Sequence, residues 1–193
     1  MTQLKIGQKA PDFTLTDSKG DQFNLYSFIS QSQHSPNLLE AQKTNKTTEI
    51  ETQGEVTNQN PNKKYKRILL YFYPKDNTPG CTIQAKNFNE LSSGYEQQGT
   101  KIIGISPDNQ KSHLNFASKF CLTLDLLCDV EHQAAEKYGV WQEKRMFLKK
   151  YMGIVRSSFL INCSDMKLEM IWSPVKGVAT HGTDVLAFIA KMP

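Results

Sequence analysis

Cys81 is the residue of this chain best placed for covalent chemistry. It follows Thr78, Pro79 and Gly80, shortly after an apolar run at residues 68–73. Thr78 can begin a helix as its N-cap, and Pro79 suits the first helical position because no N–H is needed there. Cys81 would then lie in the first helical turn, where unpaired backbone N–H groups and the positive end of the helix dipole favour the thiolate over the thiol. Because Gly80 leaves room for a small substrate beside the sulfur, the stretch predicts a reactive cysteine rather than a structural one.

The other three cysteines are Cys121, Cys128 and Cys163, and four scattered cysteines are too few for a disulfide scaffold in 193 residues. Cys121, Cys128 and His132 are candidate zinc ligands, but the chain has no Cys-x-x-Cys pair, which is the spacing typical of structural zinc sites. We therefore expect neither a metal nor a cofactor. Cys128 follows a short apolar run and should lie in the core, whereas Cys163, in a hairpin turn, should be exposed.

The elements that must position Cys81 follow from the apolar pattern. Residues 68–73 are apolar at every position, which predicts a central strand with helices on both faces of its sheet. Two short alternating runs, residues 12–15 and 22–26 on either side of a turn at 17–20, predict an N-terminal β-hairpin that covers one edge of the sheet. Further strands are expected at residues 101–106, 124–128, 158–161 and 168–172. Helices are expected from Cys81 to Gly99, around residues 114–120 and 134–138, and at 184–191, with Leu114, Ala117 and Phe120 on one buried face.

The sum is an α/β fold with a mixed central sheet flanked by helices. In such open sheets, functional sites lie beyond the carboxyl ends of the strands. Cys81 follows one such end.

Residues 31–64 differ from the rest of the chain in composition. They are rich in Gln, Asn, Thr, Lys and Glu, and they contain no aromatic residue. So little apolar surface cannot repay the entropy of ordering. We expect a single domain over residues 1–193 with a disordered insertion at about 31–64, and a docking segment for a partner remains the alternative.

Charge and hydropathy exclude several classes of protein. The formal net charge is only +4, with the basic residues spread among acidic ones, so neither nucleic acid nor a membrane is an expected partner. The first residues lack the apolar core of a signal peptide, and no apolar run approaches the roughly 18 residues of a membrane span. The expectation is a soluble, cytoplasmic protein.

The residues around Cys81, and several stretches elsewhere in the chain, resemble those of a known family. Pro74, Thr78 and Cys81 stand in the order and spacing of the peroxiredoxin signature, and residues 71–82 closely resemble the peroxiredoxin Q subfamily, also called bacterioferritin comigratory protein. Similar stretches occur at residues 7–13, 104–108, 138–141 and 150–161, so only the 31–64 segment lies outside the resemblance. It implies a thioredoxin-like fold and an antioxidant thiol peroxidase that needs no cofactor. Its implied partners are hydrogen peroxide or an organic hydroperoxide, and thioredoxin or a glutathione-type thiol as reductant, with the protein a monomer or weak dimer.

The resemblance also assigns roles by position. Cys81 would be the peroxidatic nucleophile, Thr78 a hydroxyl that bonds both the sulfur and the peroxide, and Pro74 a shield over the site. Arg156 would supply a positive charge and N–H donors. Considered singly, Pro74, Thr78 and Arg156 would be a turn residue, a helix cap and a surface charge. Gln84 stands where peroxiredoxins often have a glutamate, and its amide can accept a hydrogen bond from Arg156 without supplying a charge.

The sequence does not determine which thiol reacts with the Cys81 sulfenic acid to resolve it. Relatives carry a resolving cysteine at one of two positions, where this chain has Lys86 and Ala117. Cys121 lies one helical turn beyond Ala117 and is a candidate resolving cysteine if that helix first unwinds. The alternative is a one-cysteine cycle in which an external thiol attacks the sulfenic acid.

Two other classes of function keep the same scaffold. A peroxide sensor or disulfide exchanger would use Cys81 but turn over slowly. A holdase would function without Cys81.

Overall fold

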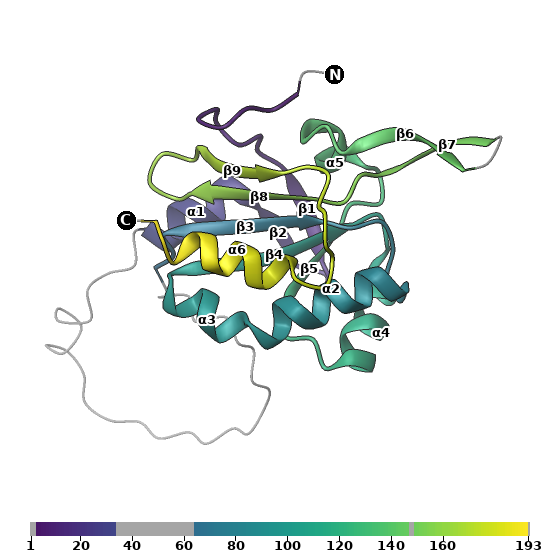
Figure 1. The fold of residues 1–193 in the computed structure, drawn as a ribbon, viewed down its shortest axis with the longest axis horizontal. Helices are drawn as coiled ribbons and strands as arrows, with labels where there is room; N and C mark the ends of the chain where they lie inside the picture. The colour runs from purple at the N-terminus through teal and green to yellow at the C-terminus, as the bar shows by residue number, and fades with distance from the viewer. Residues whose placement is uncertain (1–2, 34–63, 147–148, 193) are drawn as a thin grey trace, which may run out of the picture.

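The computed structural model describes residues 3–33, 64–146 and 149–192. Its centre is a seven-stranded sheet in the order β2-β1-β5-β4-β3-β8-β9, beside a separate β6-β7 pair (Figure 1). The strands are β1 (Thr14–Asp17), β2 (Gln22–Asn24), β3 (Arg67–Phe72), β4 (Thr100–Ser106), β5 (Asp125–Cys128), β6 (Trp141–Met146), β7 (Lys149–Ile154), β8 (Ser157–Asn162) and β9 (Leu168–Trp172). The helices are α1 (Leu25–Gln33), α2 (Pro79–Glu90), α3 (Ser92–Gln97), α4 (Gln110–Phe120), α5 (Gln133–Lys137) and α6 (His181–Ile189).

The burial of β3 on both faces accounts for the unbroken apolar run that follows Arg67. Successive side chains of a strand point to opposite faces, and every residue of β3 is buried. Ile68, Leu70 and Phe72 pack in one core cluster with residues of α1 and α5, whereas Leu69 and Tyr71 pack in a second cluster with residues of α2, α3, α4 and α6. Figure 1 shows the second group of helices in front of the sheet. The predicted α/β fold with a mixed sheet covered on both faces is confirmed.

The site lies at the carboxyl ends of three parallel strands, β3, β4 and β5. β4 pairs in parallel with both β3 and β5. Their carboxyl ends at Phe72, Ser106 and Cys128 therefore lie along one edge. Because β3 leads directly into the loop before α2, Cys81 is placed at this edge, as the strand order predicts.

The N-terminal hairpin is confirmed, but the chain then departs from the prediction. β1 pairs with β2 and with β5, so the hairpin extends one side of the sheet. The second strand was expected to reach Tyr26, yet α1 begins at Leu25. Asn24 explains the early start, because its side chain accepts a hydrogen bond from the Ser27 N–H at 2.8 Å, as an N-cap does.

The helix expected between Cys81 and Gly99 is two helices, α2 and α3, separated at Leu91. Ser92, Ser93 and Gly94 follow the break, and such residues are weak helix formers. Gly99 ends α3 with a φ of +65°, as its position predicted.

The β6-β7 hairpin was not predicted. It projects from the body of the molecule in Figure 1 and pairs in antiparallel register from Trp141 opposite Ile154 to Met146 opposite Lys149. Its residues are mostly charged or exposed, so it lacks the alternating apolar pattern by which a strand is recognised.

The predicted insertion lies almost wholly outside the described residues, which resume at Lys64. Its expected start at residue 31 is wrong, because α1 continues to Gln33 with Ser32 buried. In the described part of the chain, no helix combines the length and apolar character that crossing a bilayer requires.

Candidate active site

Cys81 lies in the first turn of α2, as predicted. Pro79 occupies the start of the helix, and Thr78 takes the N-cap position with extended backbone angles. The Cys81 side chain is only 1% exposed. A buried thiolate needs hydrogen-bond donors or positive charge in place of water.

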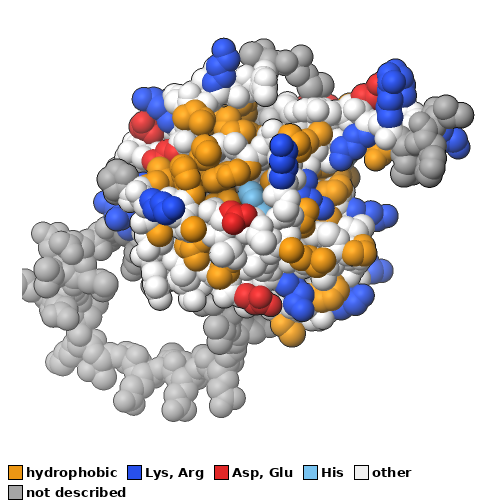
Figure 2. All heavy atoms as spheres, in the orientation of Figure 1, with side chains coloured by type: hydrophobic (Ala, Val, Ile, Leu, Met, Phe, Trp, Pro, Cys, Tyr) orange, Lys and Arg blue, Asp and Glu red, His pale blue; other side chains and the backbone are white. Residues whose placement is uncertain are grey.

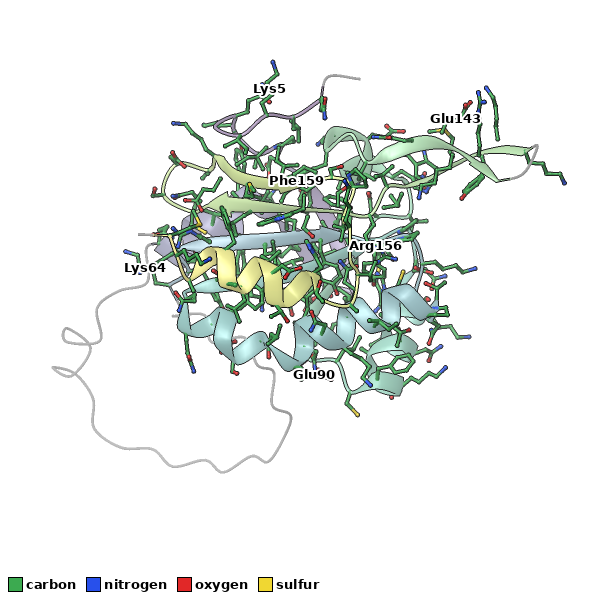
Figure 3. All side chains as sticks on the ribbon, in the orientation of Figure 1. Lys5, Lys64, Glu90, Glu143, Arg156 and Phe159 are labelled. Atoms are coloured by element: carbon green, nitrogen blue, oxygen red, sulfur yellow. The ribbon has the colours of Figure 1, made fainter. Side chains whose placement is uncertain are left out.

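Arg156 supplies that charge. Its Nη2 lies 3.1 Å from the Cys81 sulfur, and its Nη1 donates to Oε1 of Gln84, three residues further along α2. Figure 3 shows Arg156 between the sheet and α2. Because two nitrogens of the planar guanidinium have separate partners on one helix, the orientation of the group is fixed. A Cβ added at Gly80 would lie 3.5 Å from Nη2, in ordinary van der Waals contact, so the arginine passes directly beside this glycine.

Gln84 accepts from Arg156, as its amide was predicted to do. An arginine N–H can only donate, so the oxygen of Gln84 must face it and the amide nitrogen must point away. That nitrogen is buried and has no hydrogen-bond partner among the described residues. Among the residues that the structure describes, no carboxylate forms an ion pair with Arg156. The full positive charge of the guanidinium therefore faces the sulfur.

Thr78 and Pro74 are near Cys81 in the chain, but their predicted roles rest on the resemblance. The Thr78 hydroxyl donates to the Lys75 carbonyl at 3.1 Å, and in the described part of the chain it forms no hydrogen bond that caps the helix. A hydroxyl has one hydrogen, so to donate to the sulfur or to a peroxide it would have to give up the bond to Lys75. Pro74 is half-buried in the loop that leads from β3 to α2, and its shielding role stays a prediction.

A buried network that sequence reasoning missed anchors the same loop. Asp76 accepts hydrogen bonds from the Tyr73 hydroxyl at 2.8 Å and the Ser112 hydroxyl at 2.7 Å, and its Oδ2 lies 2.9 Å from Nδ1 of His113. Three donors converging on one buried side chain indicate an ionised carboxylate. The network ties the loop before Cys81 to α4.

His113 is the cation of this network. Nδ1 faces Asp76, and Nε2 lies 3.2 Å from the carbonyl of Leu127, so both ring nitrogens face acceptors and both must carry protons. Burial lowers the pKa of His113, but the hydrogen bond to Asp76 and the neighbouring Cys128 outweigh it and raise the pKa to about 10. The same pairing outweighs burial at Asp76 and lowers the pKa of that carboxyl.

The apolar face predicted for α4 was wrong at one position. Leu114 is 48% exposed, whereas His113 and Phe116 are fully buried. The buried face therefore runs through His113, Phe116 and Phe120, and the signal for it was a histidine at helical spacing from two aromatic residues.

Cys121 is not brought to Cys81. It ends α4 in a left-handed conformation, its side chain is exposed, and its carbonyl accepts from Asn89 near the end of α2. Asn89 lies more than two helical turns after Cys81, a rise of about 12 Å. A disulfide needs Cα atoms within about 7 Å, so it would require local unfolding. The resolving role of Cys121 remains a prediction.

The remaining cysteines lie in the core. Cys128 is buried, as predicted. Cys163 is also buried, at 2% exposure, so its predicted exposure is wrong. Its N–H donates to the Lys66 carbonyl, which draws the turn against the start of β3, and burial raises the pKa of its thiol to about 12. Within residues 3–33, 64–146 and 149–192, no three His, Cys, Asp or Glu side chains gather as metal ligands would.

The fold and the site together define a thioredoxin-like protein with a buried, arginine-contacted cysteine at a helix start. The chain belongs to the AhpC/TSA family, whose model matches residues 40–168. It is 36% identical over 191 residues to peroxiredoxin Bcp of Escherichia coli, with 99% of each chain covered. It is 35% identical over 189 residues to peroxiredoxin Bcp of Bacillus subtilis, covering 98% of this chain and 97% of the relative.

Solved structures of the same class are similar to this one. Bacterioferritin comigratory protein of Xanthomonas campestris, described with a trapped intermediate and an alkyl peroxide reduction activity, superposes with a TM-score of 0.71 at 28% identity, covering 96% of this chain and 98% of that one. Peroxiredoxin Q of Xylella fastidiosa gives a TM-score of 0.74 at 26% identity, with 98% of each chain covered. The resemblance to the peroxiredoxin Q subfamily is confirmed.

Proposed function

We propose that this protein is a thiol peroxidase that reduces hydrogen peroxide and organic hydroperoxides through Cys81. The observation that supports this most directly is the contact of 3.1 Å between Arg156 Nη2 and the buried Cys81 sulfur at the start of α2. The peroxiredoxin names of the relatives and the alkyl peroxide reduction described for the Xanthomonas protein agree with it.

The acidity of a cysteine would not by itself suffice for this reaction. For a generic thiol, a pKa reduced from ~8.5 to ~6 raises the thiolate fraction at pH 7 about 30-fold. Nucleophilicity falls with a Brønsted coefficient of roughly 0.45, which removes roughly a factor of ten again if peroxide attack resembles thiol exchange. The remaining rate enhancement must come from groups that act on the O–O bond.

Arg156 is placed to act on that bond. In the proposed step, the Cys81 thiolate attacks one peroxide oxygen, and an S–O bond forms as the O–O bond breaks. The electron pair leaves with the distal oxygen as hydroxide or alkoxide, which takes up a proton to give water or an alcohol. Arginine N–H groups beside the sulfur can stabilise the negative charge that develops on that oxygen. Cys81 is left as a sulfenic acid.

Recycling by an external thiol completes the proposed cycle. Neither family position for a resolving cysteine is filled, and Cys121 lies by the far end of α2 from Cys81. Thioredoxin or a glutathione-type thiol would attack the sulfenic sulfur, release water and form a mixed disulfide, which a second thiol would reduce. A cytoplasmic location, where such thiols are abundant, is part of this proposal.

The test is peroxide consumption by wild type, Cys81→Ser and Cys121→Ser, with intact-mass analysis after one equivalent of peroxide. We expect Cys81→Ser to lose turnover and the 16 Da gain expected of a sulfenic acid, and Cys121→Ser to retain rapid oxidation of Cys81. Wild-type turnover in Cys81→Ser would refute the assignment. Rapid oxidation followed by negligible turnover with either reductant would instead favour a peroxide sensor.

A further inference from the structure

Lys144 differs from the other basic residues of the projecting hairpin. Lysine and arginine side chains gather on this hairpin in Figure 2, and Arg145, Lys149 and Lys150 are exposed there. Lys144 is half-buried, and its ammonium group donates to the carbonyl of Ile154. It points back toward the body of the molecule, whereas its neighbours point into solvent.

The Lys144 side chain runs along the neighbouring strand β7. Lys144 pairs with Tyr151, yet its hydrogen bond is to Ile154, three residues further along β7. The stem crosses Gly153, where an added Cβ would lie 3.5 Å from Lys144 Cδ. That distance is an ordinary van der Waals contact, so the lysine stem passes beside Gly153 on its way to Ile154.

This hydrogen bond holds the segment that carries Arg156. Ile154 lies two residues before Arg156, and its carbonyl accepts from Lys144. The Val155 N–H donates to the Val140 carbonyl at 2.8 Å, and the Arg156 carbonyl accepts from the Val175 N–H at 2.8 Å. Each of the three residues before β8 therefore has a hydrogen bond to another part of the chain, and the bond to Ile154 comes from Lys144 in β6.

Lys144 also interacts electrostatically with the site. Burial lowers the pKa of Lys144, the Arg156 cation lowers it further, and Cys81 acts in the opposite direction. Among the residues that the structure describes, no ion pair joins a carboxylate to Lys144 or to Arg156.

Of the other described titratable groups near the site, His181 and Tyr71 are neutral at pH 7, whereas Asp76, which also acts on Tyr71, is ionised and paired with His113. Burial lowers the pKa of His181 to about 4, and burial raises the pKa of Tyr71 above its ordinary value. Gln84 supplies no charge. Arg156 is therefore the cation in contact with the sulfur, and Lys144, held at the Ile154 carbonyl, interacts with the site electrostatically.

We propose that Lys144 is a positioning residue of the Cys81 site, which fixes the Arg156 segment through Ile154 and adds a second positive charge near the thiolate. The proposal rests on the peroxidase function proposed above. Positive charge near the sulfur favours the thiolate over the thiol. The same charge favours the departing hydroxide or alkoxide.

The experiment compares Lys144→Met and Lys144→Gln with Lys150→Met, which removes an exposed ammonium from the same hairpin. The first measurement is the pH profile of iodoacetamide alkylation at the Cys81 peptide, read by mass spectrometry of the full chain after digestion. The second is the stopped-flow rate of Cys81 oxidation by hydrogen peroxide. Thermal unfolding of each variant identifies any that do not fold, and Lys144→Arg tests rescue.

We expect the alkylation midpoint to rise by about half a pH unit or more in both Lys144 variants, because a positive charge is lost from the site. We expect oxidation to slow about tenfold, because Arg156 is less well held. Lys150→Met should match wild type. Lys144→Arg should return both the alkylation midpoint and the oxidation rate most of the way to their wild-type values. The proposal is overturned if either measurement stays at its wild-type value in both Lys144 variants. Alkylation needs no peroxidase activity, so failure here is distinct from wild-type turnover in Cys81→Ser, which would refute the proposed function.

Discussion

At the residue scale, Arg156 and Thr78 differ in their contacts, although the family resemblance assigns both residues to the site. Arg156 already contacts the sulfur, whereas the Thr78 hydroxyl is committed to the Lys75 carbonyl. The resting structure thus has the charge in place but not the hydroxyl. The two residues should therefore respond differently to substitution.

Arg156→Met should slow the oxidation of Cys81 by about 10²-fold or more, the cost typical of removing one preorganised donor. Stopped-flow oxidation by hydrogen peroxide measures it, and Arg145→Met, which removes an exposed guanidinium, is the matched control. A loss below about threefold would assign Arg156 a structural role only.

Thr78→Val should have a smaller effect, of about tenfold, if the hydroxyl serves mainly to hold the loop at Lys75. The same oxidation assay measures it. A loss as large as that of Arg156→Met would show that the hydroxyl turns toward the peroxide when substrate binds.

At the element scale, the relation of α2 to α4 decides how the sulfenic acid is resolved. Cys81 begins α2, and Cys121 follows α4 beside the end of α2, where Asn89 holds its carbonyl. The ion pair of Asp76 and His113 fastens α4 to the loop before Cys81. Both attachments oppose the unfolding that a disulfide would need.

We therefore expect a one-cysteine cycle. After one equivalent of peroxide without added thiol, peptide mapping should show a sulfenic acid at Cys81 that dimedone traps, in wild type and Cys121→Ser alike. A disulfide between Cys81 and Cys121 in high yield would contradict this and show that opening is faster than trapping.

The ion pair also predicts how stability depends on pH. A histidine whose pKa is raised on folding stabilises the protein fully below its unfolded pKa of about 6.5. That contribution is lost as pH rises toward the folded pKa of about 10. His113→Gln should be less stable than wild type at pH 6.5, and the difference should shrink by up to about 1.4 kcal/mol per pH unit above it.

Urea unfolding of both proteins between pH 6.5 and 9.5 measures this difference. Comparing the two proteins separates His113 from Cys163, whose raised pKa also lowers stability at alkaline pH in both. A difference that does not change with pH would show that His113 is neutral in the folded state.

At the scale of the whole molecule, we propose that residues 34–63, which lie outside the described residues, interrupt a single domain. The chain leaves and re-enters the described structure at neighbouring points, since the Gln33 side chain donates to the Tyr65 carbonyl at 2.7 Å. Replacing residues 34–63 with a short Gly-Ser linker should change the melting temperature by less than about 4 °C. Calorimetry and the peroxidase assay test this, and a larger drop would show that the segment packs on the domain.

The sequence by itself determined the central strand of this protein and the helix start that carries Cys81. The unbroken apolar run before Cys81 specified a strand buried on both faces, and the Thr78 and Pro79 helix start specified where Cys81 would lie. These features are local, because periodicity and capping act over a few residues.

Only the tertiary structure decided which distant residues surround the sulfur. The resemblance had assigned Arg156 and Gln84 to the site, but the bond of Lys144 to Ile154 was not predicted, and His113 meets Asp76 only because α4 packs beside the loop. The β6-β7 hairpin, which positions Lys144, has no alternation of apolar and polar residues, so the sequence pattern did not predict the hairpin. Contacts between side chains far apart in sequence depend on how elements pack, and packing is a property of the whole chain rather than of any stretch of it.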